Sequence, residues 1–162
     1  MESTGFCIFD DNLNPVLIDS IYTNPKLPHG KRLKIISDRM IELKKAYPAN
    51  TIVIERGFSR FNMSTQVIYR VHGVCNLIFN NCEQIYYPPK TVKEAILKGN
   101  ATKKQVQETI KKKYPNIVFK NEDESDAFAV GLTYFIKKGK IIWEKDIVVK
   151  KKKVKKEKNL DK

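Results

Sequence analysis

The chain has 162 residues, of which 41% are apolar and 10% aromatic, and its formal net charge at pH 7 is +13. This length and composition indicate one globular domain with a sizeable core. No apolar run approaches the roughly 18 residues that span a bilayer, and the acidic start MESTGFCIFDD lacks the basic region of a signal peptide, so we expect a cytoplasmic protein without a membrane partner.

The first third of the chain predicts a strand hairpin, a helix and a further strand. Residues 4–9 and 16–23 are rich in β-formers and flank the turn sequence DDNLNP, which indicates an antiparallel hairpin. Apolar residues recur at helical spacing over 31–47, and Pro48 ends that helix. Residues 51–55 (TIVIE) are apolar without alternation, which predicts a strand buried on both faces, as in a parallel sheet.

The rest of the chain is mostly helical in pattern. Thr102 is a good N-cap for one of these helices, and Gly139 ends the last. A short strand precedes two prolines, and another is predicted at residues 141–149. The predicted helices cover residues 63–80, 91–97, 102–113 and 123–136, and the short strand covers residues 83–87. Without a glycine-rich phosphate loop, we expect no organic cofactor.

A carboxylate, Glu55, stands where the predicted strand 51–55 ends. In an open α/β sheet, ligands bind at the carboxyl ends of the strands. Burying a charge is costly unless it is paired or holds a metal ion. The structural alternative is an ion pair between Glu55 and a nearby Lys or Arg.

Asp123 and Asp126 lie three residues apart, so a helix places them on one face with Cβ atoms roughly 5 to 6 Å apart. From that spacing two carboxylates can share a metal ion. The alternative is that acidic residues favour the first turn of any helix, where they meet the positive end of its dipole. We expect Asp126 to be the stronger functional candidate, and Glu122 and Glu124 to be dipole and solvent charges.

The loop after Glu55 combines the aromatic residues Phe58 and Phe61 with Arg60, a combination suited to stacking on bases. A lid over the core is the structural alternative for Phe58.

The cysteines, Cys7, Cys75 and Cys82, are odd in number and form no CxxC pair. We interpret them as reduced core residues and not as a disulfide framework or a zinc site. His72 lies three residues before Cys75, but no second ligand pair accompanies it, so core packing is the preferred interpretation.

Basic residues exceed acidic ones in both parts of the chain. Residues 150–162 hold eight lysines and two acids, which leaves 23 basic and 16 acidic residues in 1–149. A basic body fits a polyphosphate partner, because neutralising phosphates releases counterions. We predict one folded domain at 1–149 and a disordered lysine-rich tail at 150–162, for which a solubilising role is the alternative.

The order of these elements resembles the RuvC family of Holliday junction resolvases, in the RNase H-like superfamily. The resemblance covers nearly all of residues 3–135. Its marks are the strand 52–55 followed by Phe58, the segment 93–106 (KEAILKGNATKKQV) and the D-x-x-D-A pattern at 123–127. It implies an α/β fold of the ribonuclease H type, with a mixed sheet flanked by helices.

The resemblance also implies a homodimeric endonuclease that resolves four-way or other branched DNA in recombination and repair. Such an enzyme uses Mg²⁺, for which Mn²⁺ can substitute, and two ions roughly 3.5 to 4 Å apart can activate water and stabilise the leaving oxygen. By the same resemblance, Glu55, Asp123 and Asp126 match acidic metal ligands, and Lys103 matches a lysine near the scissile phosphate. The residues expected to contact DNA are Arg56, Phe58, Arg60, Phe61, Lys93 and Lys104. The helix at 67–78 matches the dimer helix, where Gly73 permits close crossing.

One departure from the family pattern concerns the start of the chain. The family begins with a central strand that ends in a catalytic Asp, whereas this chain begins after it, which implies that Met1 is an internal methionine. A rival is that residues 4–10 form that first strand, with Asp10 as the acid, but the hairpin would then be one strand short.

Three functions remain open from the sequence. They are a metal-dependent junction resolvase, a DNA-binding dimer that does not cut because the first acid is absent, and an unrelated basic adaptor in which Glu55 and Asp126 are structural.

Overall fold

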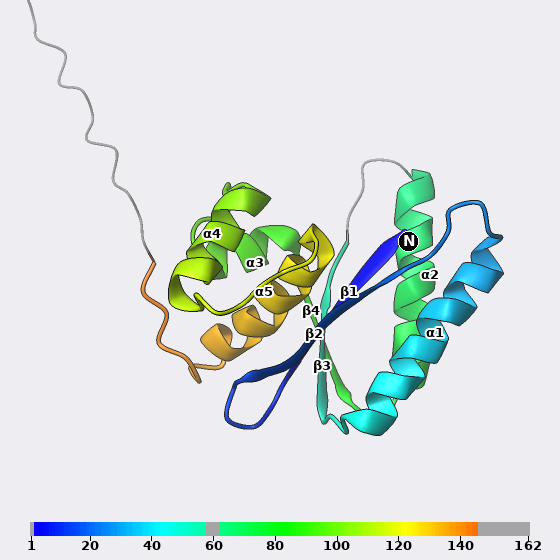
Figure 1. The fold of residues 1–162 in the computed structure, drawn as a ribbon, viewed down its shortest axis with the longest axis horizontal. Coiled ribbons are helices and arrows are strands. Elements are labelled where there is room, and N and C mark those ends of the chain that lie inside the picture. The colour runs from blue at the N-terminus through cyan, green and yellow to red at the C-terminus, as the bar shows by residue number, and fades with distance from the viewer. Residues whose placement is uncertain (1, 58–61, 146–162) are drawn as a thin grey trace, which may run out of the picture.

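A computed structural model describes residues 2–57 and 62–145 of the chain (Figure 1). These residues form four strands and five helices: β1 (Ser3–Phe9), β2 (Pro15–Tyr22), α1 (His29–Ala46), β3 (Thr51–Glu55), α2 (Asn62–Ile78), β4 (Glu83–Tyr87), α3 (Pro89–Ile96), α4 (Lys103–Lys113) and α5 (Glu122–Lys137). The predicted elements up to α5 are confirmed in type and order. The strand predicted at 141–149 is wrong for residues 141–145, which form no regular element, while residues 146–149 and the tail at 150–162 lie outside the described residues.

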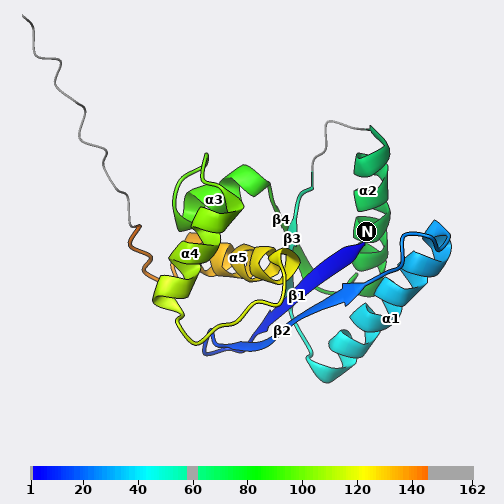
Figure 2. The same cartoon turned by 45° about the horizontal axis from the view of Figure 1, so that its top comes forward.

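The helices lie on both sides of the strands. Helices α3, α4 and α5 form one layer, and α1 and α2 form the other (Figures 1 and 2). The core on the first side centres on Phe128 of α5, which is fully buried. The core on the second side includes Ile36 of α1 and Phe79, just after α2. The apolar stripes predicted for α1 and α2 therefore face the strands.

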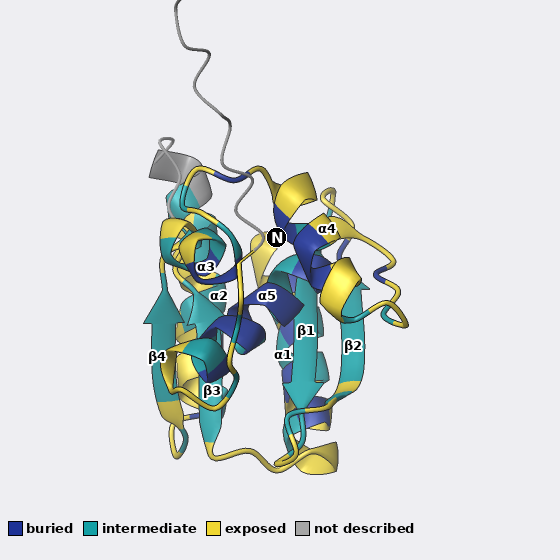
Figure 3. Ribbon diagram, turned by 90° about the vertical axis from the view of Figure 1, so that its left-hand side faces the viewer, coloured by how far each residue is buried: buried dark blue, intermediate teal, exposed yellow. Residues whose placement is uncertain are grey.

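The strands form two separate ladders. Strand β1 pairs antiparallel with β2, from Ser3 opposite Tyr22 onward, and β3 pairs parallel with β4, from Thr51 opposite Glu83 onward. Among the described residues the two ladders are not hydrogen-bonded to each other. Figure 3 shows β3 and β1 running in opposite directions with α5 visible between them.

The split between the ladders corrects one prediction. Strand β3 was expected to be buried on both faces, yet every one of its residues is partly exposed. The physical reason is that, among the residues the structure describes, β3 has a hydrogen-bonded neighbour, β4, on one side only. The other edge of β3 leaves its backbone and side chains less covered than in the interior of a sheet.

Helix α5 packs against both ladders. The ring of Phe9, at the end of β1, lies 5.2 Å from the ring of Phe128 and 5.1 Å from that of Phe135. A Cβ atom on Gly131 would lie 2.5 Å from the Phe9 ring, so glycine allows this close approach. From β3, Val53 packs into the same apolar cluster.

Two helix ends behave as the sequence predicts, and a third, the start of α5, has a side-chain cap that the sequence analysis did not predict. Thr102 caps α4 in a capping box with Gln105, and Gly139 follows α5 with a positive φ of 67°. Asn121 caps α5 through its side chain, which accepts a hydrogen bond from the Glu124 amide. None of the described helices is long and apolar enough to cross a membrane.

The cysteines are free thiols, as predicted. Cys75 is buried, whereas Cys7 and Cys82 are partly exposed. Burial raises the pKa of Cys75 to about 11, which leaves this thiol protonated at neutral pH. His72 packs between the rings of Tyr69 and Tyr86, each with its centroid 5.8 Å away, in agreement with the packing interpretation.

Candidate functional site

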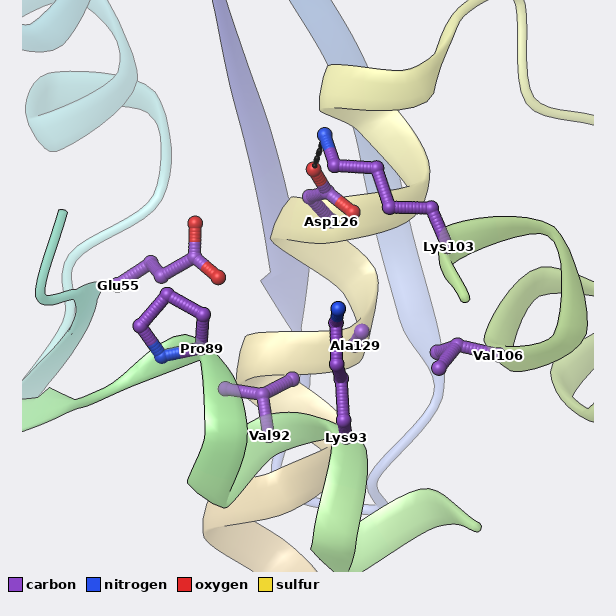
Figure 4. A pocket seen from close by; sticks show the side chains of 8 residues that line it. All are labelled: Glu55, Pro89, Val92, Lys93, Lys103, Val106, Asp126 and Ala129. Atoms are coloured by element: carbon purple, nitrogen blue, oxygen red, sulfur yellow. Dashed lines mark hydrogen bonds and ion pairs between the residues drawn. The ribbon is translucent and has the colours of Figure 1, made fainter. Parts of the chain in front are cut away.

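A pocket opens where the end of β3 meets the helical layer of α3, α4 and α5. Glu55 enters it from β3, Asp126 from α5 and Lys103 from α4, while Lys93 of α3 points into the same space (Figure 4). The remaining lining is apolar and comes from Pro89, Val92, Val106 and Ala129. The pocket therefore combines two acids with two lysines on a partly apolar wall.

Glu55 occupies the position predicted from the sequence, at the carboxyl end of its strand. Partial burial raises the pKa of its carboxyl group, and the negative charges of Asp126 and Asp123 raise it further, while Lys103 and Lys93 lower it. No cation of the described residues forms an ion pair with Glu55 within 4.0 Å. The alternative of a structural ion pair is therefore not realised in this part of the chain.

Lys103 holds the other acid of the pocket. Its Nζ atom donates a hydrogen bond of 2.7 Å to Asp126 Oδ2 and lies 3.5 Å from Glu122 Oε2. Partial burial lowers the pKa of Lys103, but its hydrogen bond to Asp126 and the charges of Asp126 and Glu122 outweigh burial, so the pKa is raised overall. Lys103 stays charged and orients the Asp126 carboxylate.

Asp123 is placed differently from Asp126. It is partly exposed and is not among the residues that line the pocket, although its charge contributes to the raised pKa of Glu55. The structure thus brings Glu55, Asp126, Lys103 and Lys93 together and leaves Asp123 at the margin.

The other predicted DNA contacts divide into two groups. Arg56 and Lys104 are exposed, and the Arg56 amide extends the β3–β4 pairing through a 2.8 Å hydrogen bond to the Tyr87 carbonyl. Phe58, Arg60 and Phe61 lie outside the described residues.

The donor set of the pocket suits magnesium in kind. Mg²⁺ prefers oxygen ligands and is commonly held by one or two carboxylates together with water and substrate phosphate. Glu55 and Asp126 supply two such carboxylates at one pocket. Within residues 2–57 and 62–145, no group of three or more His, Cys, Asp and Glu side chains is close enough to hold an ion without further ligands.

The structure corrects the interpretation of Glu124. It was expected to be a solvent charge, but only 1% of it is exposed. Its carboxylate accepts hydrogen bonds from the Ser20 hydroxyl and the Lys120 amide. The sequence carries no local signal for this, because Ser20 and Glu124 are 104 positions apart. The apolar lining of the pocket was also missed, although Val92 and Val106 follow the helical periodicity of α3 and α4.

Asp10, the rival candidate for the first acid, lies at the hairpin turn. Its carboxylate accepts a 2.8 Å hydrogen bond from the Asn14 amide, and it is not among the pocket residues. Its role in the structure is to stabilise the turn between β1 and β2.

Comparison with known proteins decides the family. The family model "Crossover junction endodeoxyribonuclease RuvC" matches residues 1–134. The chain belongs to the RuvC family. The RuvC protein of Brevibacillus brevis is 32% identical over 142 residues, which cover 80% of this chain and 83% of that protein. The RuvC protein of Alkaliphilus metalliredigens is 36% identical over 124 residues, which cover 71% of this chain and 73% of that protein.

Solved structures support the fold. Thermus thermophilus RuvC superimposes with a TM-score of 0.70 at 20% identity, covering 85% of this chain and 89% of that one. The structure of T. thermophilus RuvC in complex with a Holliday junction substrate gives a TM-score of 0.67 at 19% identity, covering 78% and 80%. The predicted RNase H-like α/β class and the RuvC resemblance are therefore confirmed.

Proposed function

We propose that this RuvC-family chain is an endonuclease that resolves four-way or otherwise branched DNA by metal-dependent hydrolysis of phosphodiester bonds. The observation that supports this most directly is the convergence of Glu55 and Asp126 with Lys103 and Lys93 in one pocket. The family match and the basic composition agree with it. The unrelated adaptor considered from the sequence does not account for the family match.

Each residue of the pocket takes a distinct role in this proposal. Glu55 and Asp126 would hold Mg²⁺, with Asp123 as a further ligand at the margin. Bound there, magnesium supplies Lewis-acid chemistry that activates water and stabilises charge on the leaving oxygen. Lys103 and Lys93 bring positive charge to the scissile phosphate and orient it, and Lys103 already neutralises Asp126 at 2.7 Å.

We further propose that the active protein has one more strand between β1 and β3. This strand would bring the catalytic Asp with which the first strand of the RuvC family ends. The split sheet supports this, because among the described residues the β1–β2 and β3–β4 ladders are separate and share no hydrogen bonds. The two strands run in opposite directions (Figure 3). A strand parallel to β3 would be antiparallel to β1 and would end at the same edge of the sheet as Glu55.

A chain that binds junctions without cutting them is the second candidate. Two observations favour it. The sheet is split into two ladders that are not hydrogen-bonded to each other among the described residues, and these residues bring only two carboxylates to the pocket.

We propose that the chain forms a homodimer through helix α2. Its outward face is a continuous exposed stripe at helical spacing, formed by Gln66, Tyr69, Arg70, Gly73, Asn76 and Leu77. Added atoms at Gly73 would meet nothing within 4 Å, so a second helix can approach closely there. Tyr69 and Leu77 on this stripe are 51% and 73% exposed, so a second helix placed there would cover two large side chains.

The activity test uses a labelled four-way junction and a linear duplex of the same sequence. The 162-residue chain is assayed with Mg²⁺, and so is an extended chain, which carries an added N-terminal segment that supplies the proposed further strand and its acid. We expect the extended chain to nick the junction in preference to the duplex. Asp126→Asn should lower the cutting rate by more than about a hundredfold, because even the outer partners of metal ligands are worth 10- to 100-fold.

The matched control is Glu108→Gln, which removes an exposed acid on α4 that is not among the residues lining the pocket. It should cut like the parent chain, and Asp126→Asn should still bind the junction. Undiminished cutting by Asp126→Asn would refute the assigned site. Junction binding without cutting by the extended chain would favour the second candidate.

A further inference from the structure

The first turn of α5 is fastened to the β1–β2 hairpin by a closed ring of hydrogen bonds. The Glu124 amide donates to Asn121 Oδ1 at 3.0 Å, and Asn121 Nδ2 donates to Ser20 Oγ at 2.7 Å. The Ser20 hydroxyl completes the ring by donating to Glu124 Oε1 at 2.9 Å. The start of α5 is thus tied to the middle of β2.

The second carboxylate oxygen of Glu124 is also engaged. Glu124 Oε2 accepts a 2.7 Å hydrogen bond from the Lys120 amide, just before the helix. Because only 1% of Glu124 is exposed, water contributes little to its solvation. A buried carboxylate is tolerated only when such partners replace water, so its position is strongly constrained by Ser20 and Lys120.

Gly5 forms a second contact at the same place. It is the partner of Ser20 in the β1–β2 register. A Cβ atom on Gly5 would lie 2.0 Å from the carbonyl oxygen of Asp123, far inside contact distance. The hairpin therefore receives the first turn of α5 at two adjacent points: Ser20 binds Glu124, and Gly5 makes room for Asp123.

The contact between the first turn of α5 and the hairpin affects the position of an acid in the pocket. Glu124 lies between Asp123 and Asp126, whereas Glu55 belongs to a ladder that is not hydrogen-bonded to the hairpin. The separation of Asp126 from Glu55 therefore depends on how the first turn of α5 is seated. We propose that Glu124, held by Ser20 and Asn121, is a positioning residue that sets where Asp126 stands relative to Glu55.

This inference rests on the proposed nuclease function and deepens it. The test uses Glu124→Ala in the extended chain, assayed for junction cutting over a magnesium titration. We expect the maximal cutting rate to fall roughly 10- to 100-fold, the range seen when residues that orient metal ligands are lost, and the magnesium concentration for half-maximal rate to rise. Junction affinity in EDTA should stay within about twofold, because the lysines of the pocket are untouched.

Two further variants separate positioning from general destabilisation. Glu124→Gln keeps one oxygen acceptor but turns an N–H group toward either Ser20 or Lys120, so it should restore part of the lost rate. Ser20→Ala should reproduce the direction of Glu124→Ala, and the double variant should be no worse than Glu124→Ala, since both remove the same ring. Glu108→Gln serves as the matched charge control.

A metal-free measurement keeps the inference distinguishable from the proposed function. Amide hydrogen exchange should accelerate in Glu124→Ala at residues 122–126, while exchange in the later turns of α5 stays as in the parent chain. If no form of the chain cuts DNA, the proposed function fails. The exchange pattern still shows whether Glu124 fixes the first turn of α5 on the β1–β2 hairpin. The positioning role would be overturned if amide exchange at 122–126 were unchanged in Glu124→Ala. It would also be overturned if Glu124→Gln were as impaired as Glu124→Ala in cutting, binding and stability together.

Discussion

At the scale of single residues, the electrostatics of Glu55 lower the stability of the folded state at neutral pH. Its pKa is raised first by partial burial and then by the charge of Asp126 in the same pocket. A raised pKa means that the folded state prefers the protonated carboxyl. At neutral pH the ionised form therefore opposes folding, a cost often found at sites whose charges are arranged for function.

We predict that Glu55→Gln stabilises the metal-free protein near neutral pH. The neutral amide imitates the protonated carboxyl, so the gain should be present at pH 7 to 8 and should vanish as pH falls through the raised pKa of Glu55 toward its ordinary value of 4.5. For a domain of this size, each 1 kcal/mol corresponds to about 2 to 4 °C in Tm, and we expect a gain of that order.

The measurement is thermal unfolding in EDTA at several pH values. Glu108→Gln, an exposed acid outside the pocket, should show no comparable gain. A Glu55→Gln variant less stable than the parent chain at pH 8 would mean that ionised Glu55 is held by favourable contacts and that the assigned electrostatics are wrong.

At the scale of elements, α2 and α5 lie on opposite sides of the strands and differ in what they expose: α5 presents an acid to the pocket, and α2 presents a stripe of exposed side chains. The buried face of α5 packs against both ladders through Phe128 and its neighbours, and the first turn of α5 presents Asp126 to the pocket. Helix α2 buries Cys75 against α1 and leaves Tyr69 and Leu77 exposed. The exposed stripe of α2 is the element-scale feature that a second copy would cover.

We predict that Leu77→Glu weakens self-association. A carboxylate placed on the stripe would have to be desolvated in a helix–helix interface, which is costly without a partner. Sedimentation velocity over a concentration series should show the parent chain as a dimer and the variant shifted toward monomer by at least about tenfold in dissociation constant.

Val118→Glu is the matched control, since Val118 is 79% exposed in a loop away from α2. It should associate like the parent chain. If both variants remain equally dimeric, the interface lies elsewhere, and a monomeric parent chain would contradict the homodimer proposal.

At the scale of the whole molecule, charge is distributed beyond the pocket. The net charge of +13 is shared between residues 1–149 and the lysine-rich residues 150–162. Helix α4 alone carries five lysines, of which Lys103 reaches the pocket. Such a surface adds affinity for a phosphate backbone without reading its sequence.

We predict that deleting residues 150–162 weakens junction binding and flattens its dependence on salt. Each phosphate contact that the tail makes adds about 0.9 to the slope of log affinity against log salt on duplex DNA. Replacing the tail by an uncharged Gly-Ser segment of equal length separates charge from chain length. A slope equal to that of the parent chain would leave the tail as a solubilising appendage.

The sequence by itself was enough to predict most of the helices and strands and to single out the two acids that line the pocket. Periodicity and turn residues are local properties, so the hairpin, α1, β3 and the capping box of α4 follow from neighbouring residues. Glu55 could be singled out because it ends an apolar strand, and Asp126 because a helix repeats every three to four residues. The order of these signals along the chain was enough to predict the RuvC family, which the family match confirms.

Only the tertiary structure decided which acids meet and what holds them. It places Asp126 in the pocket and Asp123 at its margin, a distinction that equal helical spacing cannot make. It also shows that buried Glu124 accepts a hydrogen bond from Ser20, 104 positions away in the chain, and that the two ladders are not hydrogen-bonded to each other among the described residues. The reason is physical: burial and hydrogen-bond partners arise from contacts between segments that are distant in sequence, and no local pattern encodes them.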